Sequence, residues 1–131
     1  MTDQALREKL SQARAGILTL HRALLAAERE AWERMNGRQL GNAELLQMTI
    51  ADPWFSWLQP LTTLIALMDE VMNEANDDSE VKIPVLLESA RALAHPDDDG
   101  SDFQQRYYEF VQRSPDVAVA YGIATKALSE R

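Results

Sequence analysis

The segment 3–35 carries the most regular hydrophobic pattern in the chain. Apolar residues recur there at alternating spacings of four and three, the heptad spacing of a helix that packs along one edge. The pattern predicts one helix over 3–35, capped at its start by Thr2 and ended by Asn36-Gly37, since glycine readily adopts the left-handed conformation that closes a helix. The residues of this seam are Leu6, Leu10, Ala13, Ile17, Leu20, Leu24, Ala27 and Ala31.

Such a helix is longer than its domain is expected to be wide. At 1.5 Å per residue it spans about 50 Å, so we expect its N-terminal turns either to project or to be covered by a second chain. A second apolar column, Leu18, Leu25 and Trp32, lies beside the seam and widens the apolar face. A face this wide indicates contact with two or more helices, as in a bundle.

The middle of the chain predicts a second long helix. Asp52 can cap it and Pro53 can occupy its first position, where proline is best tolerated. An apolar stripe that includes Trp54 and Trp57 continues in phase through Pro60, which favours one helix over 53–73 kinked at Pro60. The alternative is a break, with a separate helix starting at Pro60. We expect the two tryptophans in the core and leave Phe55 open between core and surface.

The remaining segments are also helical in pattern. Since no segment alternates with period two, the sequence predicts an all-α fold: one domain over 1–131, a bundle of five or six helices with a long N-terminal helix and a proline-kinked central one. In the final helix, Val119 and Ile123 lie opposite the main apolar stripe, so we expect this helix to be either central or covered by another subunit. Together with the long first helix, this favours a homodimer. The other predicted helices are 43–51, 81–94, 103–113 and 115–129.

A polar column interrupts the apolar face of the first helix. Arg7, Arg14, His21 and Glu28 recur every seven residues there, and ionisable groups in that position are costly unless they are paired. Antiparallel packing would bring Asp69 of the central helix to His21 or Arg14. We favour a structural ion pair; the functional interpretation is a polar pocket in which His21 titrates near neutrality. The candidate ligand-binding residues are His21, Arg14, Glu28, Asp69, Trp54 and Trp57.

Charge and composition exclude several classes of function. The net charge is −8, and the negative charge is concentrated after residue 38, where the chain has six Lys and Arg and sixteen Asp and Glu. This acidity disfavours nucleic acid and anionic membranes as partners, and no apolar run approaches the ~20 residues that span a bilayer. The polar start of the chain lacks the apolar core of a signal peptide, so we expect a cytoplasmic protein. The chain has no cysteine, which excludes disulfides and thiolate metal sites.

No motif for catalysis, metal or cofactor is found. The two histidines, His21 and His95, are preceded three residues earlier by Leu18 and Ala92, so the Glu-x-x-His pairs of di-iron bundles are missing. The acidic run 97–102 fails the EF-hand spacing, which makes a solvated loop the better interpretation. We therefore expect no catalytic residue, no metal site, no cofactor and no enzymatic activity.

A stretch of the central segment resembles small uncharacterised bacterial α-helical proteins. The residues that carry the resemblance are 52–61 (DPWFSWLQPL) and 68–70 (MDE), together with 20–25 (LHRALL) and 112–117 (QRSPDV). The resemblance would span most of the chain and implies a bacterial helical bundle. It carries no activity, so no catalytic residue is transferred from it.

Two functions are consistent with these patterns. The first is a non-catalytic protein–protein interaction or self-associating module, expected to form a homodimer that buries an apolar patch of the first or last helix, with a separate protein partner as another occupant. The alternative is a small-molecule-binding bundle with a pocket near His21, Asp69, Trp54 and Trp57. An internal cavity of several hundred cubic ångströms would favour the alternative.

Overall fold

The computed structural model describes residues 3–74 and 79–129, and all regular secondary structure in them is helical. The all-α prediction is therefore confirmed, with seven helices in place of five or six. Thr2, the predicted N-cap, and positions 75–78 lie outside the described residues. The acidic run 74–80, which includes the latter positions, is predicted from its charge to be a solvated loop between helices. The helices are α1 (Asp3–Asn36), α2 (Asn42–Ala51), α3 (Pro53–Ser56), α4 (Gln59–Asn73), α5 (Ser79–Leu93), α6 (Asp102–Arg113) and α7 (Pro115–Leu128).

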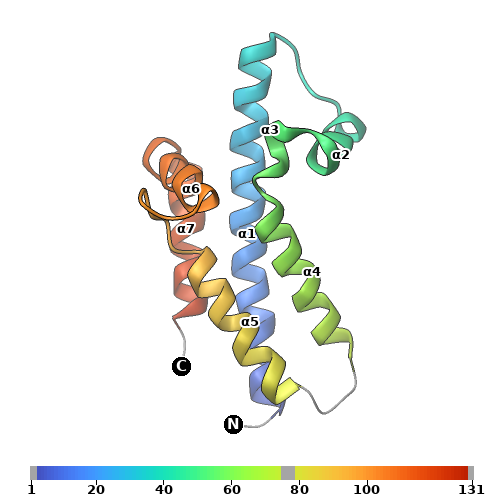
Figure 1. Cartoon of the computed structure of the whole chain (residues 1–131), viewed down its shortest axis with the longest axis vertical. Coiled ribbons are helices and arrows are strands. Elements are labelled where there is room, and N and C mark those ends of the chain that lie inside the picture. The colour runs from blue at the N-terminus through green and yellow to red at the C-terminus, as the bar shows by residue number, and fades with distance from the viewer. Residues whose placement is uncertain (1–2, 75–78, 130–131) are drawn as a thin grey trace.

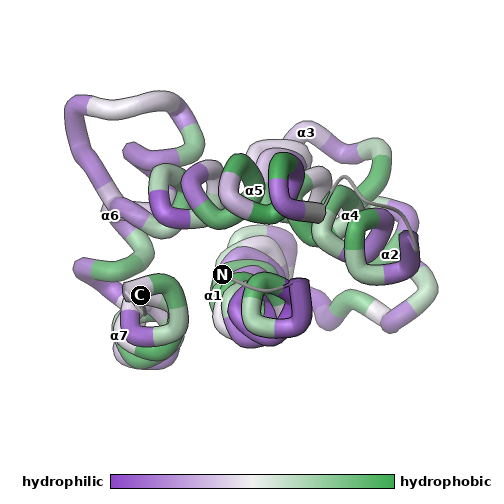
Figure 2. The backbone as a smooth tube through the Cα atoms, turned by 90° about the horizontal axis from the view of Figure 1, so that it is seen from below, coloured by the Kyte–Doolittle hydropathy of each residue, from purple (hydrophilic) through white to green (hydrophobic). Residues whose placement is uncertain are grey.

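Helix α1 is the axis of the molecule. It runs the full height of the structure, and α4, α5 and α7 pack along it, while α2 and α3 flank its C-terminal part (Figure 1). Seen along the axis, α5 lies above α1, with α4 on one side and α7 on the other (Figure 2). The main core lies between these four helices.

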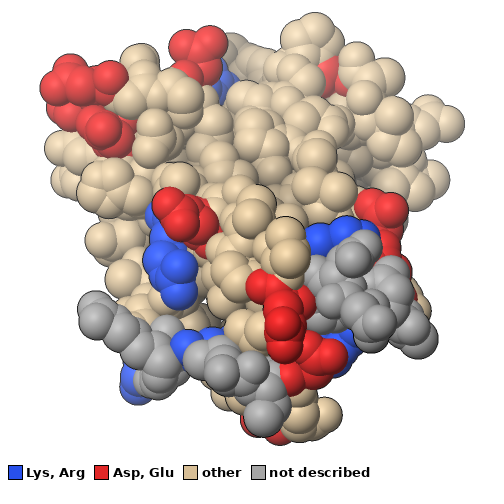
Figure 3. All heavy atoms as spheres, turned by 60° about the horizontal axis from the view of Figure 1, so that its bottom comes forward, with Lys and Arg blue, Asp and Glu red and all other residues tan. Residues whose placement is uncertain are grey.

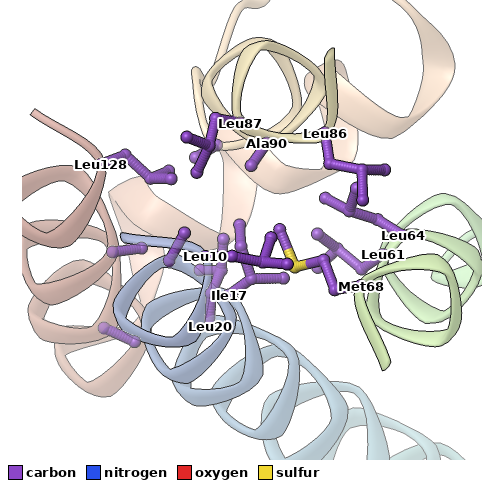
Figure 4. Close-up of a cluster of buried hydrophobic side chains, with 14 of the residues drawn as sticks. Leu10, Ile17, Leu20, Leu61, Leu64, Met68, Leu86, Leu87, Ala90 and Leu128 are labelled. Atoms are coloured by element: carbon purple, nitrogen blue, oxygen red, sulfur yellow. The ribbon is translucent and has the colours of Figure 1, made fainter. Parts of the chain in front are cut away.

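The core is built from aliphatic side chains that meet between α1, α4 and α5. Figure 4 shows Leu10, Ile17 and Leu20 of α1 turned toward side chains of the other two helices. Full burial of such a side chain contributes about 1.5–3 kcal/mol, so this layer supplies much of the favourable free energy of folding. The facing residues labelled there are Leu61, Leu64 and Met68 of α4 and Leu86, Leu87 and Ala90 of α5.

The N-terminal turns of α1 do not project. Leu6 and Leu10 are buried by the rest of the same chain, so the expectation that these turns are bare or covered by a second chain is wrong. The seam itself drifts after Leu24: Ala27 and Ala31 are half-buried, while Glu28 and Trp32 take the buried positions. A straight helix of 3.6 residues per turn turns away from a heptad seam by about 20° per heptad. The buried residues of α1 therefore recur with the period of a straight helix, 3.6 residues, and leave the heptad positions near its C-terminal end.

The helix ends follow the predicted local chemistry. Asp52 Oδ1 accepts a hydrogen bond from Trp54 N at 2.8 Å, and Ser114 Oγ accepts from Val117 N at 3.3 Å. Each cap precedes a proline at the first helical position, as predicted. Gly37 ends α1 with a φ of +68°, the left-handed conformation expected there.

The predicted single helix over 53–73 is two helices in the structure. The chain turns at Trp57 and Leu58, and α4 begins at Gln59, so the kinked-helix prediction is wrong and the alternative break is displaced by one residue. Pro60 occupies the second position of α4, where a backbone N–H would have no acceptor within the helix. Proline in a helix interior would instead remove a hydrogen bond and clash with a carbonyl.

Phe55, left open between core and surface, is fully buried. It forms a second apolar cluster with Trp32 of α1 and with Leu40 of the α1–α2 connection. The tryptophans predicted in the core are only partly buried: Trp57 packs against the main core, and Trp54 packs against the second cluster.

Candidate functional site

The polar column of α1 faces the antiparallel α3–α4 segment. At its N-terminal end, the guanidinium of Arg7 donates to the carbonyl oxygens of Val71 and Met72, both at 3.2 Å, and of Glu74 at 2.9 Å. These carbonyls belong to the last turn of α4 and to its C-cap, Glu74. The last four C=O groups of a helix have no partner within it. A cation in this position also complements the helix dipole. Arg7 therefore serves as a C-cap supplied by another helix.

The second member of the column forms the predicted ion pair. Arg14 Nε lies 2.5 Å from Asp69 Oδ1, so the expected approach of Asp69 to α1 is confirmed, with Arg14 as the partner. Both side chains are partly exposed, at 33% and 45%. Since exposed ion pairs contribute about 0–1 kcal/mol, this pair aligns the two helices more than it stabilises them.

His21 meets α4 through Thr62 instead of Asp69. Its Nε2 lies at hydrogen-bond distance, 3.2 Å, from Thr62 Oγ1. Partial burial lowers the pKa of the His21 imidazole, and the positive charge of Arg22 lowers it further. His21 is therefore held toward its neutral form. Thr62 was not among the predicted site residues, although its position seven residues before Asp69 is a signal that could have found it.

Glu28 is the buried end of the column. It is 2% exposed, and its Oε2 accepts hydrogen bonds from Trp57 Nε1 at 2.6 Å and from Arg106 of α6 at 3.4 Å. The Arg106 guanidinium also lies over the Trp57 ring, 5.4 Å from its centroid, and the ring stacks parallel to Phe110 at 5.8 Å. Glu28 and Trp57 thus join α1, the α3–α4 turn and α6. No pattern in the sequence indicated Arg106.

The structure separates one predicted residue from the others. Trp54 packs against the second cluster, as do Leu45 and Met48 of α2. Its Nε1 is buried and has no hydrogen-bond partner among the described residues. The other five predicted residues lie along the interface between α1 and the α3–α4 segment. Their polar contacts join one helix to the other.

A cleft opens beside this interface, between the C-terminal half of α1 and the α6–α7 corner. Its volume is about 680 Å³, and Glu28 is the one predicted site residue that lines it. Charges of both signs surround it, in pairs such as Arg34 with Glu30 at 2.8 Å and Arg113 with Glu109 at 3.6 Å. Ligand clefts typically measure about 300–1,000 Å³, so the cleft has room for a small molecule.

The outer face of α7 is apolar and open. Val119 is 64% exposed and Ile123, one turn later, is 48% exposed, opposite the face that packs on α1. Gly122 lies between them, and a Cβ added there would have nothing within 4 Å. The described part of the chain leaves both residues uncovered, so α7 is not the central helix that the sequence offered as one alternative.

Two further apolar surfaces are exposed. Leu46 and Ile50 of α2 are 63% and 70% exposed. Leu67 of α4 lines a groove of about 290 Å³ with Val81 and Val85 of α5. The exposed fractions of these side chains are in the same range as those of Val119 and Ile123.

The acidic run before α6 folds back on itself. Carboxylate oxygens of Asp97, Asp98 and Asp99 lie within 4.8 Å of one another, and Asp97 Oδ1 accepts a hydrogen bond from Asp99 N at 2.9 Å. No further acidic residue or histidine of the described segments joins them. These contacts are those of a solvated turn.

Over residues 3–74 and 79–129, no helix is both long and apolar enough to cross a bilayer. On the face in Figure 3, acidic and basic side chains lie in small groups with uncharged surface between them. That face offers no continuous basic surface for a phosphate backbone.

Comparison with known proteins gives no relative: no protein-family model, no curated protein and no solved structure matches the chain. The resemblance to small bacterial helical proteins therefore stays an expectation. Any assignment of function must come from the geometry of the molecule itself.

Proposed function

We propose that this protein is a non-catalytic helical bundle that self-associates through the outer face of α7. The observation that carries the proposal is the exposure of Val119 and Ile123, side by side on a helix whose opposite face is fully packed. Burying such side chains against a second chain removes them from water, at about 25 cal/mol for each Å² of apolar surface.

Gly122 supports the same assignment. Glycine in a helix interior costs about 1 kcal/mol relative to alanine. Within a single chain no neighbour requires a glycine at this position, because an added Cβ would meet open space. A glycine between two exposed apolar residues allows another backbone to approach closely, which suits a helix–helix contact between chains.

The size of the face limits the affinity. One helix of 14 residues offers a contact at the low end of the stable protein interfaces, below about 1,200 Å² in total. We therefore expect a dissociation constant in the micromolar range or weaker, and an equilibrium between monomer and dimer that depends on concentration.

Sedimentation equilibrium over a wide concentration range tests the proposal. The wild type is expected to shift from 14.8 kDa toward twice that mass. The double variant Val119→Ser/Ile123→Ser is expected to remain a monomer. The matched control is Leu46→Ser/Ile50→Ser on α2, which removes equally exposed side chains and is expected to associate as the wild type does. A wild type that stays monomeric, or a dimer lost only in the α2 variant, would overturn the proposal.

The cleft beside Glu28 favours a second function, the binding of a small molecule. Its volume of about 680 Å³ and the buried carboxylate in its lining are the supporting observations. A fragment collection screened by ligand-observed NMR tests it with the variant Ala27→Trp, which fills the cleft from α1. Fragments that bind the wild type and not the filled variant support the function. Absence of binding, or binding that the tryptophan leaves unchanged, contradicts it.

A further inference from the structure

The exposed face of α7 carries opposite charges at its two ends and apolar side chains between them. Asp116 stands in the first turn, Lys126 stands in the last, and the apolar Val119 and Ile123 lie between them. These four residues are spaced by three, four and three, so they form one straight stripe on the helix. Within the stripe each group has its complement at the mirrored position.

We propose that two copies of this chain pair through α7 in antiparallel orientation, about a twofold axis that passes near position 121. The inference rests on the self-association proposed above and names its geometry. In this register Asp116 of each copy faces Lys126 of the other, and Val119 faces Ile123. A contact of this kind is self-complementary, as a closed two-chain interface must be.

Charge decides between the two orientations. A parallel pairing would place the two Asp116 carboxylates together at one end and the two Lys126 ammonium groups together at the other. Like charges that face each other across an interface are unfavourable, and opposite charges fix the register. The antiparallel orientation turns both repulsive pairs into attractive ones.

Gly122 lies one residue from the centre of the register. At 100° per residue Gly122 lies about 60° round the helix from Val119, so the two glycines lie at one edge of the contact, near the twofold axis. Apart from its chain neighbours and the adjoining backbone of α7, no atom of the described chain lies within 4 Å of the position that a Cβ would take, so the space that the missing side chain leaves is available to the second copy.

The two charges also have an explanation within one chain. An acid in the first turn and a base in the last turn each complement the helix dipole. That explanation predicts that a charge reversal affects folding and leaves association unchanged. Association is therefore the property to be measured.

The decisive experiment mixes two charge-reversed chains. Asp116→Lys alone gives a stripe with a base at both ends, and Lys126→Asp alone gives one with an acid at both ends. Each variant is expected to self-associate about tenfold more weakly than the wild type, because two attractive pairs become repulsive. An equimolar mixture is expected to recover wild-type affinity as a heterodimer. Circular dichroism and thermal melting show that each variant is folded.

A cross-linking measurement keeps the test decisive if a charge variant folds poorly. The chain has no cysteine, so single cysteines can be placed at will. The antiparallel register predicts that a Val119→Cys chain forms a disulfide with an Ile123→Cys chain faster than either does with itself. A parallel pairing predicts faster cross-linking of identical chains.

The outcomes separate the two proposals. A wild type that does not associate overturns both. A wild type that associates, with charge variants of unchanged affinity or with faster cross-linking of identical chains, overturns the antiparallel register and leaves self-association standing. Recovery of affinity only in the mixture supports the register.

Discussion

The carboxylate of Glu28 accepts a 2.6 Å hydrogen bond from the indole Nε1 of Trp57, at the point where the chain breaks between α3 and α4. The same oxygen accepts from Arg106 of α6 at 3.4 Å. One buried carboxylate thus holds the α3–α4 turn and α6 against α1. Removing this carboxylate should weaken the packing of both the α3–α4 turn and α6 against α1.

Replacing Glu28 by leucine tests this role. The variant leaves the partly buried Trp57 Nε1 without its acceptor, and an unsatisfied buried polar group costs about 1–3 kcal/mol. We expect a loss of free energy of unfolding in that range, measured by urea denaturation. Glu28→Gln keeps an acceptor oxygen and should lose less. The control is Glu30→Gln, since the Glu30 side chain is 70% exposed; its effect should stay within about 0.5 kcal/mol. Equal losses for Glu28→Leu and Glu30→Gln would contradict the assignment.

His21 predicts a dependence of stability on pH. Burial and Arg22 lower its pKa in the folded state, while the unfolded chain keeps a value near 6.5. As the pH falls through about 6.5, the unfolded state takes up a proton that the folded state resists. The free energy of unfolding should therefore decrease below that pH and level off below the folded-state pKa.

The variant His21→Gln should flatten this part of the profile, measured by chemical denaturation between neutral and mildly acidic pH. His95→Gln is the matched control, because His95 is exposed and the decrease should persist without it. A profile that His21→Gln leaves unchanged would show that His21 is not its source.

The close approach of α1 and α7 predicts a steric effect at Gly16. A Cβ added there would lie 2.9 Å from Ala127 Cβ and 3.2 Å from Ala124 Cα, and neither atom is the end of a long side chain. Overpacking of this kind costs about 1–3 kcal/mol, more than the roughly 1 kcal/mol that alanine gains in helix propensity. We expect Gly16→Ala to lower the thermal midpoint.

The second variant for this contact is Gly16→Ala/Ala127→Gly, which moves the methyl group from one helix to the other. It should recover part of the lost stability in the same thermal melts. If Gly16→Ala melts at or above the wild-type temperature, the two helices do not approach as closely as the structure shows.

The helices themselves were predictable because local signals mark them. Leu10, Ile17 and Leu24 repeat at heptad spacing, and proline follows a capping residue at Asp52 and at Ser114. These signals act over a few residues, so periodicity alone finds them. The break at Trp57–Leu58 was predicted only as the alternative to a kinked helix, because the apolar stripe continues in phase across it.

The candidate site was only partly predictable, since its partners are far apart in the sequence. The heptad column Arg7, Arg14, His21 and Glu28 showed that α1 needs polar partners, and Asp69 was found as one of them. Arg106 could not be found, because its approach to Glu28 depends on where α6 lies in space. Which surface of α1 opens onto a cleft likewise depends on the placement of α6 and α7.

Gly122 gives the last prediction, in which folding and association move in opposite directions. Alanine at this exposed helical position meets open space within one chain, so Gly122→Ala should raise the free energy of unfolding of the monomer by about 0.5–1 kcal/mol. In the antiparallel pair the new methyl group would stand at the edge of the contact beside Val119 and take up space that side chains of the second copy would otherwise occupy. Dilute samples measured by urea denaturation, and concentrated samples measured by sedimentation, separate the two effects.

The control for this variant is Thr125→Ala, on the same helix and also exposed but outside the stripe. It gains helix propensity as well, and it should leave association unchanged. If Gly122→Ala associates as strongly as Thr125→Ala does, the two helices do not meet at Gly122, and the contact between copies must lie elsewhere on the molecule. If Gly122→Ala alone associates more weakly while its monomer is more stable, the glycine is explained by the second chain.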